Sequence, residues 1–201
     1  MAAHSGTSVP TAERIADAAV TVVARRGLDQ LSVRSVAREA GVAPGTVQHH
    51  YRSRPALLRA ALDRVVERQF GRIAAGGPHP TPLAALRAGL RQLLPLDAAR
   101  RDESIVWLAF TAAAASDAAV ADRHREVVAL MRRTTADTIR LAQRAGEVPA
   151  GIDATTSAVL VVAATDGLVV HGLSAPGRRP SLSRLCDEAV DRLLSPGGGR
   201  T

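Results

Sequence analysis

Apolar residues recur every three or four positions along most of this chain, which is the spacing of one face of an α-helix. In the first such segment the stripe consists of Ile15, Ala18, Ala19, Val22 and Val23. Stripes of this kind, bounded by capping residues, glycine or proline, predict helices over about 11–26, 32–40, 44–51, 55–75, 82–94, 101–115, 117–145, 154–171 and 181–194. The sequence therefore predicts an all-α protein of about nine helices.

Residues 32–51 predict two short helices joined by a tight turn. Ser32 is placed to cap the first helix, Gly41 gives the turn its backbone freedom, and Pro44 suits the first turn of the second helix. Small or apolar residues allow the two helices to cross closely: Val36, Ala37, Ala40, Val42 and Val47. The pattern favours a helix-turn-helix, with an ordinary helical hairpin as the alternative.

The polar residues left over from this small core suit a DNA duplex. They are Thr46, Gln48, His49 and His50 on the second helix, followed by Arg52 and Arg54. Amide, hydroxyl and imidazole groups can bind base edges or phosphates, and guanidinium groups bind phosphates. A polar face that is merely solvated is the competing interpretation.

The last two predicted helices are more apolar than a single chain of this size can cover. The helix over 154–171 is apolar on nearly every side, and such a helix in a soluble protein is covered on all sides. The helix over 181–194 carries a regular apolar stripe. We therefore predict a dimer interface formed by Val162, Val169, Leu182, Leu185, Ala189, Val190 and Leu193.

A few aromatic and polar residues of the C-terminal part are candidates for a ligand pocket. Trp107, Phe110 and Thr111 fall within about one helical turn, and aromatic rings offer apolar faces to a ligand. Two threonines interrupt an otherwise apolar face of the helix over 117–145. Core packing is the alternative for each member of the set, which is Phe70, Trp107, Phe110, Thr111, Met131, Thr134, Thr138, Asp166 and His171.

Composition narrows the class of protein. A chain of 201 residues with 46% hydrophobic content can bury one sizeable core and add a small module, so two domains are expected. Cys186 is the one cysteine, which excludes an internal disulfide and favours a reducing cytoplasm. The longest apolar run, 158–164, has seven residues against the roughly 20 of a membrane span. A soluble, cytoplasmic protein is expected.

The net charge and the absent residue types limit which partners and reactions the sequence allows. The net charge is +7, of which residues 1–60 carry +4, and a basic domain attracts polyanions such as DNA. All 26 basic residues are arginine, so a Walker lysine and a Schiff-base lysine are excluded. Zinc-ligand spacing, a G-x-S-x-G motif and a glycine-rich phosphate loop are also missing. We expect no cofactor, no metal and no enzymatic activity.

The segments ERIADAAVTVVARRGLDQLSV and GVAPGTVQHHYRSRPALL resemble the DNA-binding domain of TetR-type bacterial regulators. The resemblance is strong over about 11–60 and looser through WLAF, RAGEVP and DGLVVHGL. It implies an all-α homodimer that usually represses nearby promoters and leaves DNA when a small molecule fills a C-terminal pocket. Matched by position, it assigns DNA contact to Arg34, Thr46, Gln48, His49, His50 and Arg54.

Three positions depart from the family pattern. Gln48 stands where tyrosine is usual, Arg54 replaces lysine, and Ala43 replaces the serine that caps the second helix. A glutamine can read adenine through two hydrogen bonds, which shifts the expected operator preference.

These observations define one interpretation and two alternatives. The predicted divisions are a flexible tail over 1–10, a helix-turn-helix DNA-binding domain over 11–57, a helical ligand-binding and dimerisation domain over 58–195, and a flexible tail over 196–201. We expect a ligand-responsive transcriptional regulator, foremost a repressor, that binds a palindromic operator as a homodimer and is released by a small hydrophobic effector. A DNA-binding dimer without ligand control and a small helical enzyme are the alternatives.

Overall fold

The computed structural model describes residues 11–174 and 181–195, and within these ranges it is built from α-helices and one short 3₁₀ helix. The elements are α1 (Thr11–Arg26), η1 (Leu28–Gln30), α2 (Val33–Ala40), α3 (Pro44–His50), α4 (Arg54–Ala75), α5 (Pro82–Arg91), α6 (Ala98–Ala114), α7 (Ala118–Arg144), α8 (Ala154–Ser174) and α9 (Leu182–Leu194). The prediction of an all-α protein is confirmed. The tails predicted over 1–10 and 196–201 lie outside the described residues.

The two short helices of the N-terminal domain begin and end where their capping residues predict. The Ser32 hydroxyl accepts a hydrogen bond from the Ser35 amide at 3.1 Å, and the Ser35 hydroxyl accepts one from the Ser32 amide at 3.0 Å. Gly41 ends α2 in the left-handed conformation, with φ of 64°, where a side chain would be strained. Pro44 is the first residue of α3.

Three helix ends differ from the sequence-based expectation. Helix α8 ends at Ser174 rather than near residue 171. Helix α6 begins at Ala98 rather than near residue 101, because the Asp97 carboxylate accepts a hydrogen bond from the Arg100 amide at 2.8 Å and caps the helix earlier. Helix α5 ends at Arg91 rather than near residue 94. The amides of residues 92–94 bond to the carbonyl groups three residues back, so the last turn tightens ahead of Pro95.

Helix α4 belongs to the core of the N-terminal domain and continues beyond it. Helix α1 packs against α2, α4 and α6. The fully buried members of this core come from all of these helices and include Ile15, Val22, Val23, Val36, Val47, Leu57, Leu62 and Phe110. The first half of α4 is therefore fixed to the helix-turn-helix.

A second core lies between α5, α7, α8 and α9. Helix α8 packs against α7 and α9, and α5 packs against α7 and α9. Its most deeply buried members are Leu94, Ile139, Ala142, Ala158, Val161, Cys186 and Val190. Burial raises the pKa of the Cys186 thiol to about 11, so this thiol stays protonated at neutral pH.

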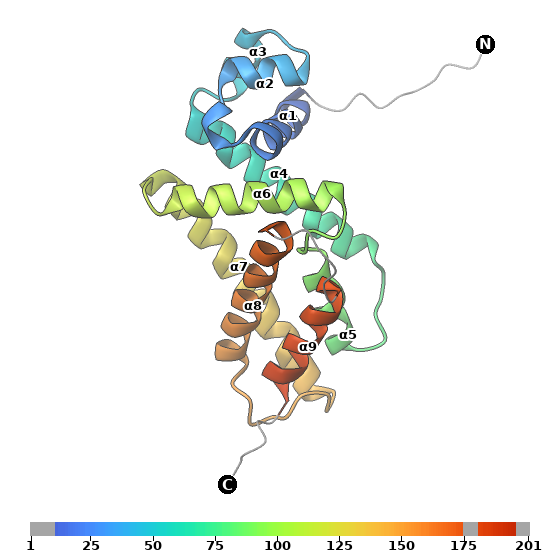
Figure 1. Ribbon diagram of the computed structural model, residues 1–201. Helices are drawn as coiled ribbons and strands as arrows, with labels where there is room; N and C mark the ends of the chain where they lie inside the picture. Colours follow the sequence, from blue (N-terminus) through green and yellow to red (C-terminus); the bar gives the residue numbers. More distant parts are fainter. Residues whose placement is uncertain (1–10, 175–180, 196–201) are drawn as a thin grey trace, which may run out of the picture.

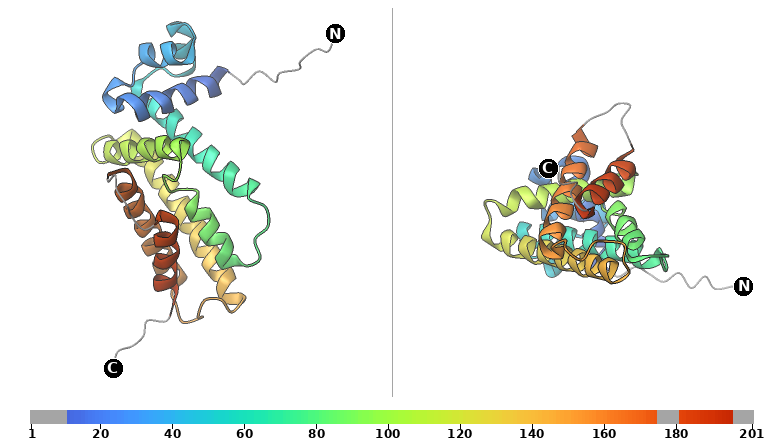
Figure 2. Two further views of the ribbon diagram at one scale, coloured as in Figure 1. Left: turned by 45° about the vertical axis from the view of Figure 1, so that its right-hand side comes forward. Right: turned by 90° about the horizontal axis from the view of Figure 1, so that it is seen from below.

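Figure 1 shows how the two cores are arranged along the molecule. Helices α2 and α3 form one end, α6 crosses the middle, and α5, α8 and α9 lie on the far side of α6. Helix α4 runs from the helix-turn-helix past α6 toward the linker that precedes α5, which the left view of Figure 2 also shows. It is the element that leads from the N-terminal core to the C-terminal helices.

Ion pairs fix α4 to its neighbours along its length. Arg64 of α4 donates from Nε to the Asp17 carboxylate of α1 at 2.6 Å. Asp63 of α4 pairs with Arg123 of α7 at 2.7 Å. Both pairs are partly exposed, so each contributes little free energy by itself but restricts the rotation of α4.

Further along α4, Arg72 pairs with a carboxylate that is almost fully buried. Glu103 of α6 is 2% exposed, and its two oxygens accept from the Arg72 guanidinium at 2.9 and 2.5 Å. Arg72 also donates to the carbonyl oxygen of Gln92 at 3.4 Å. Removing one partner of a buried pair of this kind costs about 3–5 kcal/mol, because the other charge is left without compensation. The pair therefore joins α4 firmly to α6.

Helix α8 is long and apolar enough, by length and composition alone, to cross a membrane. Core helices of soluble proteins pass the same test, and α7 and α9 cover one side of α8. The side that remains exposed carries Val159, Leu160 and Val170, whose exposed fractions are 37%, 48% and 42%.

We predict that a side chain at Gly172 of α8 lowers the free energy of unfolding. A Cβ atom there would lie 2.7 Å from Cδ1 of Leu182 and 2.8 Å from Cγ of Pro95. Gly172→Ala should lower the free energy of unfolding by about 1–3 kcal/mol because of this overpacking. Gly167→Ala, on the same helix with nothing within 4 Å, should be neutral or raise it by up to about 1 kcal/mol. Urea unfolding of both variants measures the difference, and equal stability would contradict the close packing at Gly172.

Candidate DNA-binding surface and ligand pocket

Helices α2 and α3 cross closely and share one small core. Val36, Ala37 and Val47 are buried where the two helices meet. The carbonyl oxygen of Ala37 accepts a hydrogen bond from the amide of Val42 at 3.0 Å, which closes the turn. This arrangement fixes the direction of α3 and leaves its other side free.

The residues predicted to contact DNA lie on the free side of this helix pair. Arg34, Gln48, His49 and His50 are exposed, and Thr46 is partly buried. Helices α2 and α3 form the end of the molecule farthest from α5, α8 and α9, so a long rod such as a DNA duplex can reach them (Figure 1). The hydrogen-bonding groups that the sequence predicts as base-reading groups are therefore accessible together.

The cations beside α3 fall into two groups. Arg34, Arg38 and Arg52 are exposed and form no ion pair with any residue in the described ranges, so their charges are available to phosphates. Arg54, in contrast, donates to the carbonyl oxygen of Leu28 at 2.8 Å and lies 3.5 Å from Asp29. It is half exposed but tied to η1. The sequence alone does not reveal this contact of Arg54. Because Arg52 forms no ion pair in the described ranges, its charge is more available to phosphates than that of Arg54.

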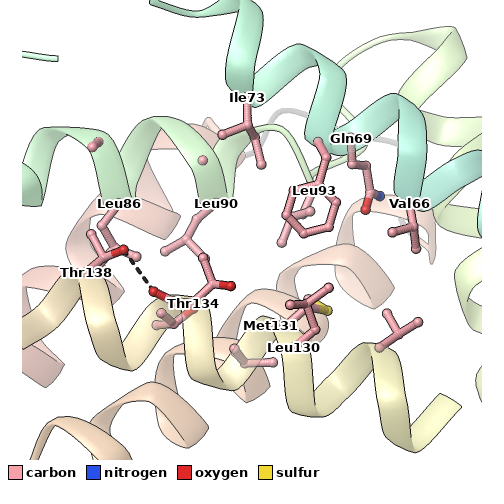
Figure 3. Close-up of a pocket in the computed structure, with 16 residues that line it drawn as sticks. Val66, Gln69, Ile73, Leu86, Leu90, Leu93, Leu130, Met131, Thr134 and Thr138 are labelled. Carbon is pink, nitrogen blue, oxygen red and sulfur yellow. Dashed lines mark hydrogen bonds between the residues drawn. The ribbon is translucent and has the colours of Figure 1, made fainter. Parts of the chain in front are cut away.

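A cavity of about 210 Å³ lies between α4, α5 and α7. Its walls are almost entirely apolar (Figure 3). Helix α4 contributes Val66, Gln69, Phe70 and Ile73, while the other walls include Leu86, Gly89, Leu90, Leu93, Val127, Leu130, Met131, Thr134, Thr135, Thr138 and Val162. Phe70, Ile73 and Leu130 are each more than a third exposed, which places an apolar opening on the surface.

Few polar groups face this cavity. The Thr138 hydroxyl donates to the carbonyl oxygen of Thr134 at 2.9 Å, in the way that a helical threonine satisfies itself. The amide of Gln69 and the hydroxyl of Thr135 form no hydrogen bond with the described residues. No ionisable side chain lines the cavity among the residues that the structure describes.

A second cavity, of about 320 Å³, lies between α6, α7 and α8 and has a polar wall. The Trp107 indole N–H donates to Asp166 at 3.1 Å, and the indole ring stacks on His124 with 5.2 Å between ring centroids. The Thr111 hydroxyl donates to the Trp107 carbonyl oxygen at 2.9 Å and lies 3.2 Å from Nε2 of His124. These polar groups therefore satisfy one another.

Burial shifts both ionisable groups of this wall toward their neutral forms. Burial lowers the pKa of His124, and the positive charge of Arg132 lowers it further. Both effects favour the neutral imidazole. Burial also raises the pKa of Asp166 above its usual value, opposed by the hydrogen bond from Trp107. No cluster of three metal-ligating side chains is found in the described part of the chain.

The predicted pocket residues separate into three groups. Phe70, Met131, Thr134 and Thr138 line the first cavity, whereas Trp107, Thr111 and Asp166 line the second. Met131, Trp107 and Asp166 also line a small cavity of about 20 Å³, which shares lining residues with both. Phe110 is fully buried in the N-terminal core, because its face of α6 points toward that core and not toward a cavity. His171 lies on the exposed side of α8, away from both cavities.

Several lining residues of the first cavity are not predicted by the sequence. Gln69, Leu86, Leu90, Leu130 and Thr135 follow helical periodicity like ordinary core residues. A signal available in the sequence is Gln69 itself, an amide on the face of α4 that also carries Val65, Val66 and Ile73.

The residues predicted to form a dimer interface differ in exposure. Val162, Val169 and Val190 are buried within this chain, packed between α8 and its neighbours. A side chain that is buried inside its own chain cannot contact a second chain. The remaining members, on α9, are partly exposed: Leu182, Leu185, Ala189 and Leu193.

Family models match both parts of the chain. Residues 15–61 match the model of bacterial regulatory proteins of the tetR family. Residues 82–195, more than half of the chain, match the C-terminal model of BetI-type transcriptional repressors. The first match contains the helix-turn-helix, and the second contains α5 to α9.

Individual relatives agree with this assignment. The regulator TtgR of Pseudomonas putida is 28% identical over 197 residues, covering 92% of this chain and 93% of its own length. A solved transcriptional regulator from Rhodococcus sp. is 32% identical, with a TM-score of 0.80 over 92% of this chain and 96% of that one. A solved regulator from Saccharomonospora viridis, in complex with choline, is 27% identical, with a TM-score of 0.79 over 90% and 94% of the two chains.

The architecture and the helix-turn-helix agree with these matches over both parts of the chain. The protein therefore belongs to the TetR family of bacterial transcriptional regulators.

Proposed function

We propose that this protein is a repressor that binds a palindromic operator as a homodimer and leaves it when a small hydrophobic effector binds. The cavity between α4, α5 and α7 is the proposed effector pocket. The observation that carries this proposal is the placement of α4, which lines the cavity with Phe70 and Ile73 and is fixed to the helix-turn-helix core through Leu57 and Leu62. A molecule that moves α4 would also move α3.

Helix α3 is the proposed recognition helix. In a two-fold dimer, two such helices enter successive major grooves, about 34 Å apart along the duplex. The exposed side chains of Gln48, His49 and His50 would then face base edges, while Arg34 and Arg52 would neutralise phosphates. The half-sites of the operator should therefore lie about one helical turn apart.

The exposed face of α8 is the proposed centre of the dimer interface. Val159, Leu160 and Val170 form an apolar surface that nothing in the described chain covers. The partly exposed leucines of α9 extend this surface. Two copies packed together would bury it, which is the favourable outcome for an apolar patch of this kind.

The effector pocket favours ligand control over a constitutive DNA-binding dimer. An apolar cavity that opens to solvent is a typical small-molecule site. The Saccharomonospora viridis relative in complex with choline supports the view that this fold admits small molecules.

The direct test is binding of the purified protein to DNA upstream of its own gene and of the neighbouring genes. The assay uses two salt concentrations and unlabelled competitor. A protected palindrome that random DNA does not displace is the expected result. Salt-sensitive binding without sequence preference would contradict the proposed operator recognition.

We predict that two substitutions in the helix-turn-helix have different effects. Gln48→Ala should reduce operator affinity by about 1–3 kcal/mol per half-site and leave binding to random DNA unchanged, because it removes a base contact. Arg34→Ala should weaken binding to both DNAs and lower the salt slope by about 1 for each phosphate that the variant no longer neutralises. Fluorescence anisotropy across a salt series measures both effects. Arg133→Ala, an exposed arginine of α7, is the control; identical behaviour of all three variants would refute the assigned surface.

We predict that a charge on α8 separates the dimer. Leu160→Glu places a carboxylate in the proposed interface, so the variant should sediment as a monomer and lose operator affinity by at least about 100-fold. Leu141→Glu, on α7, is the matched control, because the exposed fractions of the two leucines are 48% and 47%. Sedimentation velocity at micromolar concentration distinguishes the species. If the Leu160→Glu variant remained a dimer, the interface would have to lie on another surface of the chain.

A further inference from the structure

The effector pocket offers no partner for a charged ligand. Among the described residues its lining contains no aspartate, glutamate, histidine or arginine, and most of its surface is hydrocarbon. An ion that leaves water for such a site loses its hydration and gains no counter-charge. Binding that buries the charged group of a ligand inside the cavity is therefore strongly opposed, whichever the sign of the charge.

An organic cation has two further ways of binding, and neither is available here. Aromatic faces can replace a carboxylate, but Phe70 is the one aromatic residue in the described lining and is 42% exposed. Asp166 lies against the second cavity and accepts the hydrogen bond from Trp107. Asp166 also lines a small cavity that borders the effector pocket at Gln69 and Met131. This cavity has a volume of about 20 Å³, which is room for about one water molecule, so the carboxylate is out of reach of an organic cation in the effector pocket.

The pocket does offer a neutral hydrogen-bonding group. The Gln69 side chain extends from α4 toward α7, and its amide faces the space beside Met131 (Figure 3). Neither this amide nor the hydroxyl of Thr135, a residue that is 6% exposed, is hydrogen bonded within the described chain. A ligand that covers Gln69 without pairing with it would leave a desolvated amide, which is costly.

We propose that the effector is an uncharged molecule, mainly hydrocarbon, with one hydroxyl or carbonyl group that pairs with Gln69. This inference rests on the proposed function of the cavity as the effector pocket. An apolar cavity of about 150 Å³ holds benzene, so a cavity of about 210 Å³ fits a molecule somewhat larger. The proposed effector is uncharged, whereas choline, which the Saccharomonospora viridis relative holds, is a cation.

Three compounds of equal chain length test the charge preference. Octan-1-ol, octyltrimethylammonium and octanoate share the same hydrocarbon tail and differ in the head group. Calorimetric titration of the full-length protein at pH 7 should show octan-1-ol binding at least about 100-fold more tightly than either ion, because each ion is buried without a partner. Octan-1-ol should also weaken binding to the operator. Equal or tighter binding of either ion overturns the proposal.

Two substitutions of Gln69 test the recognition group. Gln69→Leu removes the hydrogen bond and keeps the apolar wall, so it should weaken octan-1-ol binding by about 3- to 10-fold. Gln69→Glu keeps the shape and adds a carboxylate, so it should make octyltrimethylammonium the preferred ligand. If neither substitution changes the order of affinities, Gln69 does not select the ligand.

A pocket-filling variant separates failure of this inference from failure of the proposed function. A Cβ atom at Gly89 would meet only Cδ1 of Ile73, at 4.0 Å, so Gly89→Leu should fill the pocket without moving the backbone. It should lose octan-1-ol binding by at least about 10-fold.

The two failures have different signatures. If octyltrimethylammonium binds the natural chain and Gly89→Leu abolishes this binding, the pocket is correct and the charge inference is wrong. If Gly89→Leu leaves octan-1-ol binding intact, or if none of the three compounds binds, the proposed effector pocket itself fails.

Discussion

Helix α4 is packed into both halves of the molecule, and this constraint determines how the DNA-binding end and the pocket are related. Its first half is buried with α1 in the N-terminal core, whereas Phe70 and Ile73 in its second half face the cavity. A continuous helix transmits rotation and translation along its axis, because its backbone hydrogen bonds resist bending. Movement at one end of α4 therefore displaces the other.

The buried pair between Arg72 and Glu103 limits which movements of α4 are possible. It lies one turn beyond Gln69 along the helix and joins α4 to α6. Separating the two charges would strand a carboxylate that is 2% exposed, so α4 and α6 are expected to move together. A ligand between α4, α5 and α7 thus acts on a two-helix unit. Because the Arg72–Glu103 pair holds the two helices together, α4 is expected to shift as a rigid body with α6 rather than to bend by itself.

The sequence predicts the fold better than the site, for a physical reason. Helix ends depend on nearby residues, so Ser32 and Gly41 predict the two ends of α2 correctly. The Asp97 cap of α6 is harder to recognise, because an aspartate that caps a helix looks like a loop residue in the sequence. Periodicity identifies the apolar face of a helix but not the neighbour it meets. It consequently predicts Phe110 as a pocket residue although it is core, and it does not distinguish Gln69, which lines the cavity. For the same reason, it places Val162 against a partner chain although its own chain buries it.

The chain has no lysine, and this has a consequence for regulation. Every ion pair between its described helices uses a guanidinium group, which remains cationic throughout the alkaline range. Carboxylate partners raise the pKa values of Arg64 and Arg72 of α4 further. Acetylation, which silences lysine ammonium groups in many proteins, has no side-chain target here. The ion pairs that position α4 are therefore insensitive to base and to acetyl transfer.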